Sequence, residues 1–165
     1  MDLLRAWRHL TTSRRRALRD FPPSTLAAIE QTIRDSEATH SAEIRFVLEP
    51  ALALPAVLGG VTPLARARGL FATLGVWDTA RNNGVLVYLL FADRAIEIVA
   101  DRGYTGRVDD AQWRGVCAAA EAAFARGEFT AGSLTLLERV GALAALHFPP
   151  HPADVDELPD SPTIL

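Results

Sequence analysis

The 165-residue sequence contains no lysine, a single cysteine and no unbroken apolar run of membrane-spanning length. Cys117 cannot form an internal disulfide, and its alanine-rich helical surroundings favour a buried small side chain over a nucleophile. No segment approaches the roughly 18 apolar residues of a membrane helix. The arginine-containing N-terminus also lacks the apolar core of a secretory signal. These absences predict a cytoplasmic protein with no disulfide and no transmembrane segment.

Common catalytic and nucleotide-binding motifs are also absent. The sequence has no glycine-rich phosphate loop, no HExxH or CxxC motif and no GxSxG nucleophile elbow. Covalent serine or cysteine catalysis therefore has no support. The net charge of −3 argues against general nucleic-acid binding, although all 17 basic residues are arginine.

The stretch that organises the predicted fold lies in the middle of the chain, at residues 84–101. Val85 to Phe91 is apolar on both faces, and Ala95 to Ala100 is a second strand-like run. The short polar segment Ala92-Asp93-Arg94 separates them and is interpreted as a turn. Two runs this close predict a β-hairpin. Because its first strand has no polar face, we expect that strand in the centre of a sheet covered on both sides.

The other predicted elements surround this hairpin. Helical spacing predicts a helix from Ser24, as N-cap, to about Thr39, and Glu43 to Leu48 alternates as a strand. A helix starting at Thr62-Pro63 connects that strand to the hairpin, which makes the first two strands parallel if they pair. Two more helices are predicted at about 109–126 and 130–146. The predicted class is α/β, a three-layer α/β/α sandwich with a small mixed sheet.

Three segments divide the chain: 1–20, the domain 21–148, and 149–165. The first is a basic amphipathic helix with six arginines and an apolar stripe of Leu3, Leu4, Trp7 and Leu10. Such a helix could bind a protein partner or a membrane-associated assembly, or it could dock on its own domain and expose its arginines. The last segment is rich in proline and acidic residues, which predicts a tail that is disordered or follows the surface.

Parallel pairing of the first two strands gathers polar residues at one edge of the sheet, where these strands start and the third ends. The predicted neighbours come from three parts of the chain: Glu37, His40, Glu43, Asp78, Arg81, Asn82, Asn83, Asp101 and Arg102. Asp78 and Asp101 are candidate ligands of Ca²⁺ or Mg²⁺, which prefer carboxylate and amide oxygens. Arginines beside a cation could orient a phosphate, and His40 or Glu43 could transfer protons. The alternative is a set of solvated ion pairs.

Several stretches resemble a known family. LFATLGVWDTARNNGVLVYLLFADRAIEIVADRGY, residues 70–104, resembles a stretch of the TPM domain. There an aromatic-led helix end precedes an Asn-Gly or Asp-Gly strand start, an apolar strand, an Asp-Arg turn and a second strand. ARGEFTAGSLTLLERVGAL, residues 125–143, is similar to the family's Gly-acidic-aromatic pair before its last helix. Residues 30–48 fit the helix and strand that open the domain, and 36–43 resembles a short, soluble, bacterial-type branch.

The resemblance implies an α/β sandwich over about residues 23–148. It implies weak metal-linked phosphatase activity, as in some members, or accessory and repair roles in protein assemblies, as in others. The family often has glutamate and glycine where this chain has Val99 and Asp101, so the acid is shifted. The predicted function is therefore a non-catalytic binding or accessory module, with Ca²⁺ or Mg²⁺ as candidate ligand. The alternative is a weak metal-dependent phosphatase of phosphate monoesters, with Asp78, Asp101 and His40 as candidate catalytic residues.

Overall fold

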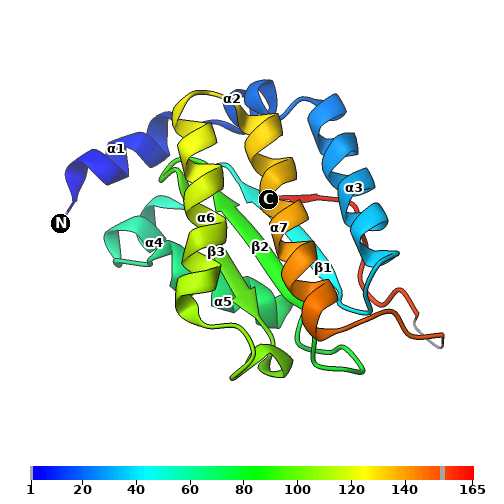
Figure 1. The fold of residues 1–165 in the computed structure, drawn as a ribbon. Coiled ribbons are helices and arrows are strands. Elements are labelled where there is room, and N and C mark those ends of the chain that lie inside the picture. The colour runs from blue at the N-terminus through cyan, green and yellow to red at the C-terminus, as the bar shows by residue number, and fades with distance from the viewer. Residues whose placement is uncertain (1, 153–154) are drawn as a thin grey trace.

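The computed structural model describes residues 2–152 and 155–165 (Figure 1). One mixed sheet has the strand order β3-β2-β1-β4. Its strands are β1 (Ile44–Glu49), β2 (Val85–Leu90), β3 (Ala95–Ala100) and β4 (Thr163–Ile164). β1 pairs in parallel with β2, and β2 pairs antiparallel with β3. The predicted hairpin and the predicted parallel pairing are therefore confirmed.

Helices cover both faces of the sheet (Figure 1). One face carries α3 (Pro23–Glu37), α6 (Asp110–Ala125) and α7 (Phe129–His147), and the other carries α4 (Leu54–Leu58) and α5 (Pro63–Thr73). The N-terminal segment forms α1 (Leu3–Thr11) and α2 (Arg14–Asp20), and a 3₁₀ turn, η1 (Arg102–Tyr104), follows β3. This is the α/β/α sandwich that the sequence predicted.

Side chains that alternate along the strands feed two separate hydrophobic cores. Phe46 and Val87 pack with α3, α6 and α7, whereas Val47, Leu86 and Tyr88 pack with α4 and α5. Every residue of β2 is buried, as its two apolar faces predicted. Because each buried square ångström of apolar surface contributes about 25 cal/mol, these two clusters are the main source of stability.

α7 belongs to the first of these cores. Among the described residues it is the one helix long and apolar enough, by length and composition, to cross a membrane. Leu137, Val140 and Ala144 are fully buried in the cluster that α7 shares with α3 and α6. The core helix of a globular domain meets the same criterion, and this packing explains the apolar composition of α7.

The first three helices differ from the prediction in two ways. α3 begins at Pro23 with Pro22, not Ser24, at the N-cap position, because proline suits the first helical turn. Residues 3–20 form two helices because Ser13 lies between them and caps α2, accepting the backbone N–H of Arg16 at 3.2 Å.

The C-terminal tail takes part in the fold. Residues 163 and 164 form β4, which pairs in parallel with β1 at Val47 and Leu48. Leu158 is buried in the second core. Of the two predicted states of the tail, disordered or following the surface, residues 155–165 show the second. The sequence did not predict that they would add a strand.

Candidate functional site

The rim of the sheet where β1 and β2 begin and β3 ends brings together the segments that the topology predicted. Gly103 donates its N–H to the carbonyl oxygen of Asn82, and Asp101 donates its own to that of Gly84, both at 2.9 Å. The Nε of Arg102 donates to Oδ1 of Asn82 at 2.7 Å. A Cβ on Gly103 would collide with the Asn82 carbonyl, so this close approach requires glycine.

The loop before β1 joins the same rim through Ser41. The side-chain amide of Asn83 donates to the Ser41 carbonyl oxygen. A guanidinium nitrogen of Arg81 lies 3.5 Å from the Ser41 hydroxyl. Asn83 is fully buried, and Thr79 accepts its backbone N–H at 3.0 Å. The Asn83 amide and the Arg81 guanidinium therefore connect the loop before β1 with the loop before β2, where the two parallel strands start.

His40 lies near this rim but packs between helices. Its Nδ1 accepts the N–H of Ala42 at 3.2 Å, and its Nε2 lies 2.9 Å from the Ser36 hydroxyl. A Cβ on Gly141 of α7 would come within 3.6 Å of Nε2. The residue is only 1% exposed, which is unfavourable for direct contact with a substrate in solvent. Proton transfer by His40 stays a prediction.

The two predicted metal ligands have different environments. Asp78 is exposed. Asp101 is buried, and its Oδ1 caps η1 by accepting the N–H of Arg102 at 2.7 Å. Its Oδ2 is buried without a hydrogen-bond partner, so it has capacity for one more bond. The group of potential metal ligands found among the described residues includes neither Asp78 nor Asp101, and a metal shared by the two stays a prediction.

A second carboxylate group lies on the β1 side of the rim. Glu37, Asp156 and Asp160 each place one carboxylate oxygen within 4.8 Å of the others. Together with Glu43 and Arg34 they line a pocket of about 230 Å³, which we call the acidic pocket. The sequence analysis selected Glu37 and Glu43 but missed the two tail aspartates. The sequence feature that could have revealed these two aspartates is the acidic run DVDELPD, which the sequence analysis assigned to a tail.

Glu43 fixes residues 157 and 158 of the tail beside this pocket. Its Oε2 accepts the backbone N–H groups of Glu157 at 3.2 Å and Leu158 at 3.0 Å. The Glu157 carboxylate in turn accepts the N–H of Ala80, at 3.0 and 3.1 Å from its two oxygens. The tail is therefore held both to β1 and to the loop before β2.

Two arginines hold the next part of the tail. Arg45 of β1 donates to the carbonyl oxygens of Pro159 and Ser161. The Nε of Arg34 pairs with Oδ2 of Asp160 at 3.3 Å. This ion pair fixes one oxygen of the Asp160 carboxylate, and the other oxygen, Oδ1, has no hydrogen-bond partner.

Burial and crowding disfavour negative charge in the acidic pocket. Burial, with smaller contributions from Asp160 and Glu43, raises the pKa of Glu37 to about 9, although the N–H that Ile44 donates to Glu37 at 2.7 Å opposes this shift. Burial also raises the pKa of Glu43 to about 7 and raises that of Asp156. Asp160 Oδ1 is buried without a hydrogen-bond partner, on a side chain only 10% exposed. A cation would relieve both the repulsion and the missing contact.

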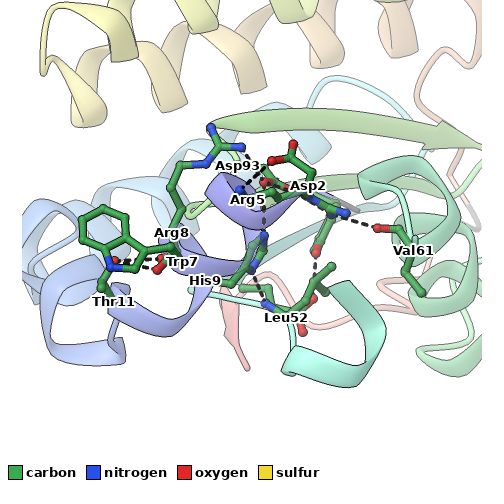
Figure 2. A network of polar contacts seen from close by, with 11 residues as sticks. Asp2, Arg5, Trp7, Arg8, His9, Thr11, Leu52, Val61 and Asp93 are labelled. Atoms are coloured by element: carbon green, nitrogen blue, oxygen red, sulfur yellow. Dashed lines mark hydrogen bonds and ion pairs between the residues drawn. The ribbon is translucent and has the colours of Figure 1, made fainter. Parts of the chain in front are cut away.

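The opposite end of the hairpin carries a polar cluster that the sequence analysis interpreted only as a turn. Asp93 accepts hydrogen bonds from Arg5 at 2.8 to 3.2 Å and lies 3.1 Å from Nε2 of His9 (Figure 2). Because His9 Nδ1 accepts the N–H of Leu52 at 2.9 Å, we assign the ring hydrogen to Nε2. Burial alone would raise the pKa of Asp93, but these two partners hold it below its usual value. The cluster anchors α1.

Comparison with known proteins identifies the class to which this fold belongs. A family model described as the TPM domain matches residues 20–143, and the chain belongs to this family. The predicted resemblance is thereby confirmed. The chain is also similar to the BA42 protein of the psychrophilic bacterium Bizionia argentinensis, solved by NMR. The two are 31% identical with a TM-score of 0.75, over 86% of this chain and 93% of that one. A search of curated proteins found no match.

Proposed function

We propose that this TPM domain is a non-catalytic binding module whose acidic pocket binds a divalent cation, Ca²⁺ or Mg²⁺. One observation carries the proposal: Glu37, Asp156 and Asp160 bring three carboxylate oxygens within 4.8 Å of one another. The buried Oδ1 of Asp160, which makes no hydrogen bond, adds support, because a buried acceptor without a partner is costly unless a ligand satisfies it.

Carboxylate oxygens no more than 4.8 Å apart can share one calcium ion. Oxygens bound to one Ca²⁺ at about 2.4 Å lie at most about 4.8 Å apart, and calcium accepts irregular sets of six to eight oxygens. Mg²⁺ demands a tighter octahedron and keeps more of its water. Glu37 comes from α3, whereas Asp156 and Asp160 come from the tail, so a bound cation would link the two segments. We therefore expect Ca²⁺ to bind more tightly than Mg²⁺.

Two features of the structure favour binding over catalysis. Burial and nearby Glu121 and Glu97 raise the pKa of Cys117 to about 12, which makes it a poor nucleophile. His40, the candidate general acid or base, is buried between α3 and α7. Neither Cys117 nor His40 is therefore well placed to act as an exposed catalytic group.

A titration tests the cation site. Purified protein is titrated calorimetrically with CaCl₂ and with MgCl₂, beside Asp160→Asn, which removes one charge but keeps the shape. Asp35→Asn is the matched control, because Asp35 is an exposed acid of α3 outside the pocket. We expect Asp160→Asn to lose about tenfold or more in affinity and Asp35→Asn to match the parent. Absence of binding, or equal binding by all three proteins, would contradict the proposal.

The second candidate is the metal-dependent phosphatase. The observation that favours it is the buried Oδ2 of Asp101, which has no hydrogen-bond partner and is adjacent in sequence to Arg102, an arginine that could orient a phosphate. A phosphate monoester assay with Mg²⁺, Mn²⁺ or Ca²⁺ separates the two functions. Turnover above that of Asp101→Ala would favour the enzyme. Equal background rates would favour the binding module.

A further inference from the structure

α1 is amphipathic, but it docks with its polar face inward. Its apolar stripe is exposed: Leu3 66%, Leu4 78%, Trp7 64% and Leu10 66%. The buried residues of the helix are Ala6 and His9, and the Arg5 side chain is only 15% exposed. Helical spacing puts the two sets on opposite faces. The hydrophobic effect by itself favours the reverse orientation, so the exposed stripe requires an explanation.

Directional polar contacts hold this orientation (Figure 2). Arg5 donates to Asp93 and, at 2.8 Å, to the carbonyl oxygen of Val61. His9 bridges Asp93 and the N–H of Leu52. Turning the stripe inward would break all of these bonds and leave the largely buried Asp93 side chain without these partners. The domain therefore presents the stripe to the outside.

The surroundings of the stripe are cationic. Residues 2–20 contain six arginines and two aspartates, whereas the whole chain is negative. The three exposed arginines 14–16 make no ion pair in the part of the chain that the structure describes. Arg8, Arg16 and Arg94 line a cleft of about 630 Å³ together with Trp7 and one acid, Asp20. Of these arginines, Arg8 also pairs with Asp93 at 3.6 Å. Apolar and cationic groups thus share one end of the molecule.

We propose that this end docks on an anionic lipid bilayer. The stripe would insert at the interface, where leucine and tryptophan side chains are favoured, and the arginines would bind lipid phosphates. Charge complementarity favours an anionic bilayer over a second copy of the chain as the partner of this surface. A second copy of the chain would bring two arginine-rich segments together, whereas an anionic surface neutralises them. Four apolar residues and several arginines form a reversible attachment, not a spanning one.

Vesicle co-sedimentation tests the proposal, with chelator present so that the acidic pocket plays no part. The full chain is mixed with vesicles of phosphatidylcholine alone or of phosphatidylcholine with phosphatidylglycerol. We expect binding to the anionic vesicles only, weakening with added salt. The double variant Leu4→Ser, Trp7→Ser should bind about tenfold more weakly. Leu58→Ser, Leu146→Ser, at exposed leucines outside α1, should bind like the parent.

A second pair of variants isolates the charge. Arg14→Gln, Arg15→Gln and Arg16→Gln together should reduce binding, whereas Arg114→Gln with Arg139→Gln, exposed arginines of α6 and α7, should not. Unchanged thermal unfolding would show that all variants are folded. No binding to anionic vesicles, equal binding to neutral ones, or an unaffected stripe variant would overturn the proposal. A dimer in sedimentation that the stripe variant abolishes would assign the surface to a second copy instead.

Discussion

At the residue scale, single carboxylates decide how separate segments meet. Asp93 binds α1 to the hairpin turn, and Glu43 binds the tail to β1. Their pKa values move in opposite directions because Asp93 faces Arg5 and His9, whereas Glu43 is buried near other acids. At neutral pH the negative charge of Asp93 therefore stabilises its contact with α1. Burial disfavours the charge of Glu43, which weakens its contact with the tail.

Asp93→Asn removes the acceptor charge that Arg5 and His9 share. We expect a loss of about 2–4 kcal/mol in the free energy of unfolding, because Arg5 keeps its charge in a largely buried place. The lowered pKa of Asp93 means that its contribution is present above its unfolded value of 3.8 and is lost as pH falls through the folded value. Urea unfolding across acid pH measures both effects. An unchanged midpoint would contradict the anchoring role.

Glu37→Gln tests the charge in the acidic pocket. The folded pKa of about 9 lies above the unfolded 4.5, so the stability that Glu37 contributes is full below 4.5 and is lost as pH rises to about 9. With chelator present, urea unfolding of the parent should show stability falling over this range. The slope should be smaller in Glu37→Gln, which keeps a neutral side chain throughout. Equal slopes would show that Glu37 is ionised in the folded protein.

At the element scale, the edges of the sheet depend on close contacts between segments distant in sequence. The end of β3 meets the loop before β2 at Gly103, and the tail covers the outer edge of β1 through β4 and Leu158. A covered edge cannot pair with another chain. The tail thus completes both the sheet and the acidic pocket.

Gly103→Ala should separate η1 from the loop before β2. Its Cβ would collide with the backbone carbonyl of Asn82, which cannot move without breaking the rim, so we expect a loss of about 1–3 kcal/mol. Gly115→Ala in α6 is the control, because nothing lies within 4 Å of the added Cβ and alanine favours the helix by about 1 kcal/mol. Thermal or urea unfolding should shift in opposite directions for the two variants.

Leu158→Ala should loosen the tail. Leu158 is buried in the second core, so its truncation should cost about 2 kcal/mol or more and speed proteolysis of the tail. Cation affinity should fall as well, because Asp156 and Asp160 flank this anchor. Val155→Ala, at an exposed position, should change neither quantity. A tail equally resistant to protease in both variants would disprove this anchoring.

At the scale of the whole molecule, charge is divided between the two ends of the strands. The arginine-rich N-terminal segment lies near the hairpin turn, and the acidic pocket lies at the rim where β1 and β2 begin. No ion pair connects these two regions among the residues that the structure describes. The geometry therefore separates the proposed membrane contact from the proposed cation site.

Cation binding should stabilise the whole domain. A ligand at 100 times its Kd adds about 2.7 kcal/mol to the free energy of unfolding if it binds only the folded state. For a chain of this size that corresponds to a rise in Tm of roughly 5–10 °C. Thermal unfolding with excess Ca²⁺ should show this shift in the parent and not in Asp160→Asn. An unchanged Tm at saturating Ca²⁺ would argue against a site in the folded protein.

The predictable part of this molecule follows from local patterns. The apolar run 85–91, the Asn82-Asn83-Gly84 strand start and the proline at 63 predicted the hairpin, the crossover and the family. The rim was predictable because strand direction alone decides which ends meet. Asp156 and Asp160 were not, since pairing a two-residue strand with β1 depends on contacts more than 100 residues apart.

The sequence by itself determined the class of fold, the parallel and antiparallel pairings, and the set of segments that meet at one rim, because hydrophobic periodicity and chain connectivity leave few alternatives. Only the tertiary structure decided which face of α1 turns inward and where the acidic tail lies. Both outcomes depend on a few directional bonds from Asp93 and Glu43 to distant residues, and no local pattern encodes such bonds.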